Sequence, residues 1–406
     1  MRRQFIYVTT PICIAIIVAG AWLADAGNLN PPPGPVNPTM VTLDDINATA
    51  LSAGDKRTPI ASLPFTINQC GSYFLTGCLT GAAGQNGITI AADDVTLDLN
   101  GFALIGVPGS LDGINMAGFQ DNVVIRNGHV RAWGESGIDA RIHVGRIERI
   151  TATDNGAWGI ENSFGGTFTS HIASCEALRN GVLVASSGGI QGAGSTLITD
   201  CIASENTGNG ISVSTGSTVA DCLAGSNTGG GIVGSLNCTV SSSTASTNNG
   251  IGIFINSGAI KSCVANANDM DGIVGSRCVI SACTSDGNLG DGIEVASGSV
   301  VLNNSCDGNG PAGADGAGIH VTGSDNRIEG NNVTNNDRGI DFGFPTGGTN
   351  NIVIKNTARN NVDGVTLTNY KFPLGVLNTV GEILDFTGGG GVLTASNSSP
   401  WANFEY

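Results

Sequence analysis

One full repeat of the chain lies in the stretch Asn206-Thr-Gly-Asn-Gly-Ile-Ser-Val-Ser-Thr-Gly-Ser-Thr-Val-Ala-Asp-Cys-Leu-Ala-Gly-Ser-Asn227-Thr-Gly-Gly-Gly-Ile232. Its Gly-Ile pair at position 210 returns at position 231, and its asparagine at position 206 returns at position 227. A glycine followed by isoleucine or valine recurs in this way thirteen times between Gly87 and Gly364, at spacings of 20 to 30 residues. Self-similarity at this period is typical of a solenoid.

The repeats are built from strands. Apolar and polar residues alternate, β-branched residues are frequent, and glycine, asparagine, serine and threonine interrupt the pattern every few residues. About 21 residues hold three short strands and three turns, which is one coil of a parallel β-helix. We therefore predict an all-β, single-stranded parallel β-helix of about 13 coils. Its winding should be right-handed, as in nearly all parallel crossover connections.

Two further registers support this fold. Asparagines recur at one turn, and we interpret them as a structural ladder of stacked side chains; they are Asn206, Asn227, Asn248, Asn268, Asn288 and Asn309. Cysteines recur in another register, at Cys201, Cys222, Cys263 and Cys283. Because cysteine behaves as a small apolar residue, we expect these thiols to point inward.

The ends of the chain differ from the repeats. Met1-Arg2-Arg3, an apolar stretch and Ala24-Asp25-Ala26 form the pattern of a cleavable signal peptide, although an uncleaved anchor is the alternative. Export permits disulfides, and Cys70 and Cys78 are the best candidates for one. The predicted organisation is a signal peptide at 1–26, a proline-rich linker at 27–40, an N-terminal cap at 41–80, the β-helix at 81–368 and a C-terminal cap at 369–406.

The composition limits the possible partners. The 406 residues carry a formal net charge of −16, with 17 basic residues against 33 acidic ones. A chain without a basic stripe is unsuited to nucleic acid, because phosphates must be neutralised by lysine and arginine. We expect a secreted or cell-surface protein, monomeric, with no membrane span once the signal is removed.

Several segments resemble a known group of proteins. They are Thr58-Pro-Ile-Ala-Ser-Leu-Pro-Phe-Thr-Ile, Gly71-Ser-Tyr-Phe-Leu-Thr-Gly, Asp94-Val-Thr-Leu-Asp-Leu-Asn-Gly and Ser399-Pro-Trp-Ala-Asn-Phe. In these the chain resembles secreted bacterial right-handed parallel β-helix repeat proteins, within the pectate-lyase-like superfamily. The resemblance implies the fold and export. The superfamily includes polysaccharide lyases, hydrolases and epimerases as well as adhesins and phage spikes, so the fold does not select an activity.

The better-known catalytic signatures of that superfamily are missing from this chain. It has no Arg-x-Pro-x-x-Arg, Gly-His-Gly, Arg-Ile-Lys or Asp-Pro-His-Asp motif. No catalytic residue is therefore transferred by resemblance. We predict no cofactor and no metal ligands; calcium is compatible with the fold but no motif supports it.

Candidate sites follow from the repeat. If the residue after each glycine points inward, the next one points outward and forms a row along the rod. This row reads Asn115, Asp139, Glu161, Gln191, Ser212, Val233, Phe254, Val274, Glu294, His320, Asp341 and Thr366. It is polar at both ends and mostly neutral or apolar between them, which defines two candidate clusters.

The first cluster lies in coils two to five. Six of the seventeen basic residues fall between Arg126 and Arg179. Arginines, carboxylates and aromatic rings together suit an anionic or hydroxyl-rich glycan. We take Trp133, Arg141, Trp158 and Arg179 as candidate carbohydrate-binding residues and Asp139, Glu161 and His143 as weak catalytic candidates. The alternative is a surface belt of ion pairs with tryptophans packed under loops.

The second cluster is Glu294, His320 and Asp341, on three consecutive coils. An imidazole between two carboxylates can act as a general acid or base, or bind a metal. Charge complementarity between neighbouring strands explains the trio equally well. The 26 residues between Gly292 and Gly318 could also shift His320 out of line.

These observations favour an exported protein that binds polysaccharide along its side, with cleavage or modification of the polysaccharide as an extension of the same hypothesis. A lyase-like or hydrolase-like reaction is the enzymatic version of this hypothesis. The competing interpretation is a non-catalytic structural or adhesion module of the cell surface, which the regular central coils favour.

Overall fold

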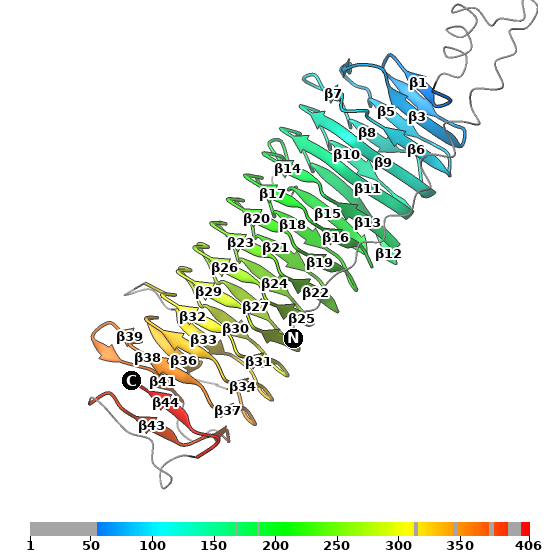
Figure 1. Ribbon diagram of the computed structural model, residues 1–406. Helices are drawn as coiled ribbons and strands as arrows, with labels where there is room; N and C mark the ends of the chain where they lie inside the picture. Colours follow the sequence, from blue (N-terminus) through cyan, green and yellow to red (C-terminus); the bar gives the residue numbers. More distant parts are fainter. Residues whose placement is uncertain are drawn as a thin grey trace, which may run out of the picture. The chain divides into compact units, whose positions relative to one another are not determined.

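The computed structural model describes residues 55–167, 169–184, 187–311, 316–343, 348–372, 377–388 and 399–406. The predicted signal peptide and linker lie outside these residues. Residues Arg57–Tyr406 form one unit, a rod of stacked coils in which every coil adds one strand to each of three faces (Figure 1). Among the described residues, no helix has the length and apolar character needed to cross a membrane.

One face of the rod is a sheet of fourteen parallel strands, which we call sheet B. In order, its strands are β2 (Phe65–Ile67), β5 (Ile88–Ile90), β8 (Ile114–Met116), β10 (Ile138–Ala140), β12 (Ile160–Thr167), β15 (Ile190–Gly194), β18 (Ile211–Val213), β21 (Ile232–Gly234), β24 (Ile253–Ile255), β27 (Ile273–Gly275), β30 (Ile293–Val295), β33 (Ala317–Val321), β36 (Arg338–Phe342) and β41 (Tyr370–Lys371). The prediction of about 13 coils was therefore close, and the parallel β-helix is confirmed.

The second face is a ladder of parallel strands, which we call the first ladder. It contains β1 (Thr58–Ile60), β3 (Gly71–Leu75), β6 (Val95–Asp98), β9 (Gln120–Arg131), β11 (Ile142–Thr153), β13 (Thr169–Ala173), β16 (Leu197–Thr199), β19 (Thr218–Ala220), β22 (Cys238–Ser241), β25 (Gly258–Lys261), β28 (Cys278–Ser281), β31 (Val300–Leu302), β34 (Arg327–Glu329), β37 (Ile352–Ile354) and β42 (Thr379–Val380).

The third face is the second ladder. It contains β4 (Leu79–Thr80), β7 (Ala103–Ile105), β14 (Glu176–Leu178), β17 (Ile202–Ser204), β20 (Leu223–Gly225), β23 (Thr244–Ser246), β26 (Val264–Asn266), β29 (Thr284–Asp286), β32 (Ser305–Asp307), β35 (Asn332–Thr334), β38 (Thr357–Arg359), β44 (Asn403–Glu405) and β43 (Ile383–Asp385). The two ladders merge into one 28-stranded sheet because the long strands β9 and β11 run through both.

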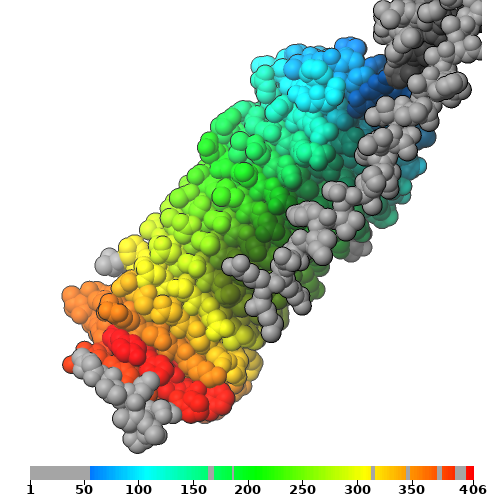
Figure 2. All heavy atoms as spheres, viewed as in Figure 1, coloured from blue at the N-terminus to red at the C-terminus, as the bar shows by residue number. Residues whose placement is uncertain are grey.

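The core is a set of columns that run along the rod. Isoleucine fills the inward position after the glycine in twelve consecutive sheet B strands, β5 to β36, and each of these side chains is fully buried. Burying one such side chain contributes roughly 2 kcal/mol. In the space-filling view the colours succeed one another in bands, as expected when each coil packs only on its neighbours (Figure 2).

The asparagine ladder is confirmed and is longer than expected. It runs from Asn155 to Asn369, through eleven buried asparagines. Within it, the side-chain oxygen of each asparagine accepts hydrogen bonds from both the backbone and side-chain N–H groups of the preceding one, as between Asn227 and Asn248 at 3.1 and 2.9 Å. The side-chain amide nitrogen also donates to a backbone carbonyl, for example from Asn248 to Ala224 at 3.1 Å. Buried polar groups are thus paired without help from water.

The cysteine row points inward, as predicted. Cys201, Cys222, Cys263 and Cys283 are at most 4% exposed, and their thiols donate to backbone carbonyls. Beyond Cys283 the same column continues with asparagines, beginning at Asn304, whose oxygen accepts from the Cys283 backbone N–H at 2.9 Å. The row is therefore part of the packing.

The predicted disulfide is not formed in the structure. Cys70 and Cys78 are both exposed free thiols. The extended strand β3 lies between them and spans about 17 Å, whereas the Cα atoms of a disulfide lie about 5.5 Å apart.

The ends of the rod differ from the regular repeat. Strands β2, β3 and β4, within the segment expected to act as a cap, already pair in parallel with β5, β6 and β7 and make a coil of their own, and β1 pairs with β3 before it. The prediction that a last coil begins at Gly364-Val365 was wrong. This dipeptide lies in a hairpin between β39 (Val362–Asp363) and β40 (Thr366–Leu367), and Val365 is 98% exposed. Sheet B instead continues with Tyr370 and Lys371.

Candidate functional site

The second cluster is brought together by the strand register of sheet B. Glu294 on β30 lies opposite His320 on β33, and His320 lies opposite Asp341 on β36. The long connection before β33 therefore does not displace His320. Lys371 on β41 follows Asp341 in the same row, in the place that the sequence assigned to Thr366. Four neighbouring coils thus present an acid, an imidazole, an acid and an amine.

A carboxylate that the sequence analysis missed holds the imidazole. Asp291 is 5% exposed, and its Oδ2 lies 2.7 Å from Nδ1 of His320. Its Oδ1 accepts the backbone N–H of Ala317 at 2.6 Å, while Asp271 Oδ1 accepts the backbone N–H of Asp291 at 2.7 Å. Asp291 is therefore fixed from both sides. When Nδ1 carries the proton that it shares with Asp291, the lone pair of the imidazole is on Nε2.

The surroundings shift the proton affinities of this group. Burial alone would lower the pKa of His320, but its hydrogen bond to Asp291 and the charges of Asp291, Asp341 and Glu294 raise it above the ordinary value. Burial also raises the pKa of Glu294, and the neighbouring charges of Asp271 and Asp291 add to that increase. A carboxyl group and an imidazole whose pKa values are both raised by their surroundings lie side by side here, and such a pair can exchange protons with a bound group.

Two cations adjoin the same group. The guanidinium of Arg338 is 8% exposed, and its Nε lies 2.5 Å from Oδ2 of Asp341 in an ion pair without hydrogen-bond geometry. The amine of Lys371 lies 3.7 Å from the same oxygen and is 43% exposed. We call the seven residues the acid–base cluster: Asp271, Asp291, Glu294, His320, Arg338, Asp341 and Lys371.

The cluster also contains a possible ligand set for a metal. One ligand atom each from Asp291, Glu294 and His320 lies within 4.8 Å of the others. Calcium prefers six or more oxygen ligands and does not suit an imidazole. A softer divalent ion would compete with the proton between Asp291 and His320. The donor set therefore fits acid–base chemistry better than it fits calcium.

The first cluster is only partly assembled by the fold. Asp139 on β10 lies opposite Glu161 on β12, and Arg141 is 3.6 Å from Asp139. Ser136 donates its hydroxyl to Glu161 at 3.1 Å, and its backbone N–H donates to the buried Asp112 at 2.9 Å. These residues form a polar patch on the same face of sheet B as the acid–base cluster, five coils or more towards the N-terminus.

The remaining candidates of the first cluster lie elsewhere. Trp133 is 1% exposed and fills the core, where its indole donates to the carbonyl of Leu104 at 3.3 Å, so it cannot serve as a surface platform. Trp158 is also buried, at 9%. Arg179 pairs with Asp154 at 2.8 Å at an exposed turn, and His143 lies outside sheet B, 2.6 Å from Asp121. For the tryptophans, the alternative of packing under loops was the better one.

The strongest electrostatic feature of the first patch is Asp112. Burial raises the pKa of Asp112 to about 7; the charges of Asp139 and Glu135 add to the increase, and the backbone N–H of Ser136 opposes it. An unfolded aspartic acid titrates near pH 4. The folded protein therefore holds an additional proton between about pH 4 and pH 7, and its stability falls as the pH rises through that window.

We expect Asp112→Asn to remove this part of the pH dependence, because the amide is neutral and retains an oxygen for the Ser136 N–H. At pH 8 the variant should be more stable by on the order of 2 kcal/mol, and at pH 4 it should equal the native protein. Urea unfolding at both pH values measures the difference. The control is Asp93→Asn, which removes an exposed carboxylate. A native-like decline between pH 4 and pH 8 in Asp112→Asn would contradict the assignment.

A sequence signal for the missed acids exists. Asp112, Asp271 and Asp291 all stand in the triplet Asp-Gly-Ile, one residue before the repeat glycine. In the structure this position borders sheet B, and its carboxylate accepts the backbone N–H of the next coil. Each Asp-Gly-Ile triplet thus predicts a carboxylate that lies beside the row of outward side chains on sheet B.

Comparisons with known proteins agree with this architecture. Residues 171–326 match the family model described as right handed beta helix region. The A-module of mannuronan C-5 epimerase AlgE4 from Azotobacter vinelandii has 15% identity and a TM-score of 0.43, over 82% of this chain and 93% of that one. The periplasmic alginate epimerase AlgG has 12% identity and a TM-score of 0.44, over 74% and 78%.

A pectate lyase, Pel9A, has 15% identity and a TM-score of 0.30, over 66% of this chain and 75% of that one. No curated protein matches the sequence. These solved structures are distant similarities. Together with the coils described above, the match of residues 171–326 shows that the fold is a right-handed parallel β-helix.

Proposed function

We propose that the protein binds a polysaccharide along the outer face of sheet B and modifies it by proton transfer at the acid–base cluster. The observation that carries this proposal is the hydrogen bond of 2.7 Å between Asp291 and His320 beside Glu294. It provides a base on Nε2 of His320 and an acid on Glu294, within reach of one bound group.

The row of outward side chains on sheet B that leads to the acid–base cluster supports a polymer as the ligand. Val233, Phe254 and Val274 lie half-buried on three consecutive coils next to Glu294. An aromatic ring flanked by aliphatic side chains is a surface on which the apolar face of a sugar ring can pack. Phe254 lies two coils from Glu294, which is about 10 Å. A chain of sugars that reaches the cluster would therefore also cover this strip.

The two cations suggest which part of the ligand reacts. Arg338 is buried between Asp337 and Asp341, whereas Lys371 is 43% exposed beside Asp341, so Lys371 is the cation that a carboxylate on the sugar can reach. Such a charge makes the C–H next to the carboxylate more acidic. His320 would then take this proton. Glu294 would return a proton, either to the carbon or to the departing glycosidic oxygen.

The test is a screen of glycans with and without uronate residues, in the presence and absence of calcium. Chain cleavage, unsaturated products and inversion at carbon are each measured by chromatography, ultraviolet absorbance and NMR. We expect one uronate polymer to react and His320→Gln to abolish the reaction. His143→Gln is the matched control, because His143 is exposed and lies outside sheet B. Binding of glycans without any turnover would instead favour the adhesion module.

A further inference from the structure

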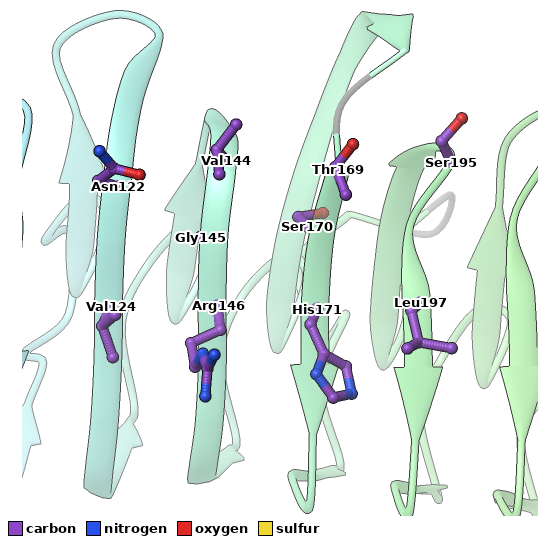
Figure 3. Close-up of a pocket in the computed structure, with 10 residues that line it drawn as sticks. All are labelled: Asn122, Val124, Val144, Gly145, Arg146, Thr169, Ser170, His171, Ser195 and Leu197. Atoms are coloured by element: carbon purple, nitrogen blue, oxygen red, sulfur yellow. The ribbon is translucent and has the colours of Figure 1, made fainter.

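A separate pocket lies on the first ladder, across β9, β11, β13 and β16 (Figure 3). It has a volume of about 420 Å³, within the range of ligand sites. Two rows of outward side chains cross it. The upper row is Asn122, Val144, Thr169 and Ser195, and the lower row is Val124, Arg146, His171 and Leu197. None of these residues belongs to sheet B.

A bulge shapes the middle of this pocket. The pairing of β9 and β11 changes register on both sides of Val144, just before Gly145. Gly145 has φ of +152°, and a Cβ atom there would lie 2.1 Å from the carbonyl oxygen of Val123. Only glycine fits there, because a side chain would collide with the backbone of β9. On the next strand Ser170 turns inward and bonds to Asn162 and Thr196, so its side chain does not fill the space between the two rows.

The lower row places a cation and an imidazole side by side. Arg146 lies opposite His171 in the strand register, with Val124 and Leu197 on either side. Arg146 is 56% exposed and contacts Glu148 at 3.6 Å, whereas Glu148 makes a closer ion pair with Arg149 at 2.9 Å. Glu148 therefore neutralises Arg146 only in part, and much of the Arg146 side chain is open to solvent.

The imidazole is fixed and neutral. Nε2 of His171 lies 2.8 Å from the hydroxyl of Thr199. Burial lowers the pKa of His171, and the positive charge of Arg146 lowers it further. Near pH 7 the ring is therefore a hydrogen-bonding group and not a second cation. It can bond to a hydroxyl while Arg146 holds an anion.

The other walls suit a sugar ring. Thr169 and Ser195 are exposed and carry hydroxyls along the upper row. Val144 and Leu197 are 41% and 37% exposed and offer aliphatic surface for C–H groups. Polar groups that converge on a partly apolar surface are the usual composition of a ligand site.

From these features we propose that the pocket is a second binding site, which takes a sugar residue carrying a carboxylate. Arg146 holds the carboxylate, and His171 and the hydroxyl row hold the sugar hydroxyls. The site has no acid–base pair of its own, so it anchors a glycan without changing it. It does not depend on the activity proposed for the acid–base cluster.

The charge distribution of the rod agrees with an acidic ligand here. The chain as a whole is strongly acidic, yet six of its seventeen basic residues lie between Arg126 and Arg179. All six belong to or directly follow β9, β10, β11 or β14, strands at the same level of the rod as the pocket. The same segment holds six acidic residues, so it is neutral while the chain as a whole is strongly acidic, and it repels an anionic chain less than the rest of the rod.

The test uses cellobiouronic acid and cellobiose, which differ by one carboxylate, with the full-length protein in calorimetry and NMR titration. We expect the acid to bind and the neutral disaccharide to bind at least tenfold more weakly. Arg146→Gln should weaken binding of the acid at least tenfold. The matched control is Arg149→Gln on the same strand, which removes the same charge at nearly the same exposure, 57% against 56%.

Three outcomes would overturn the proposal: equal affinity for both disaccharides, unchanged affinity in Arg146→Gln, or an equal loss in Arg149→Gln, which would indicate only diffuse charge attraction. Inorganic sulfate is titrated in parallel, and competition by sulfate at the same concentration as the acid would show a general anion site. His171→Gln should also weaken binding, without loss of stability. Polysaccharide turnover at the acid–base cluster is measured in the same variants and should not change. The proposal for this pocket and the proposal for the acid–base cluster can therefore be rejected independently.

Discussion

Asp291→Asn should reduce turnover of the polysaccharide by about 10²- to 10⁴-fold. The carboxylate of Asp291 accepts the proton on Nδ1 of His320, which leaves Nε2 free to act as a base. An asparagine can turn its amide towards Nδ1 and donate, and the ring proton then moves to Nε2. The Oδ1 contact with the backbone of Ala317 can be kept by the asparagine oxygen, so the fold should be preserved.

The same substitution should lower the pKa of His320. The hydrogen bond and the charge of Asp291 are the two largest influences that raise this pKa against the effect of burial. An NMR titration of the imidazole measures the shift independently of any substrate. The control is Asp269→Asn, which removes an exposed carboxylate from a nearby turn. If both variants leave the titration of His320 unchanged, the Asp291–His320 pair does not exist in solution.

Much of the fold could be predicted because a solenoid repeats its local rules. A glycine before an inward isoleucine and an asparagine at one turn were enough to place the coils, since each coil packs on its neighbours only. Prediction failed where the repeat ends. Gly364-Val365 has the right local sequence, but Tyr370 and Lys371 take its place in sheet B, and the segment closes as a hairpin.

The candidate site was predicted in outline only. Periodicity alone placed Glu294, His320 and Asp341 in one row, because adjacent coils align residues at equal positions. It gave no information about side chains that reach the row from its border, such as Asp291. Periodicity also did not predict that Trp133 is buried. Charged residues lie two positions before and after it, yet Gly81, Gly87 and Gly113 leave room for its ring inside the rod.

The asparagine ladder predicts the largest effect on stability. Asn248→Leu should lower the free energy of unfolding by on the order of 4 kcal/mol. Leucine has a similar volume but cannot accept the two N–H groups of Asn227 or donate to the carbonyl of Ala224. These groups are buried, so water does not replace the lost bonds. The midpoint of urea unfolding measures the change.

The matched control is Asn249→Leu at the next position, which is exposed and should shift stability by less than about 0.5 kcal/mol. The difference between the two variants isolates the buried bonds from the effect of adding an apolar side chain to the same turn. Because each coil depends on its neighbours, the loss should also increase hydrogen exchange at Asn227 and Asn268 before it does so at the ends of the rod. Equal unfolding midpoints for the two variants would mean that the ladder orders the turn without stabilising it, and the isoleucine columns would then carry the stability of the coils alone.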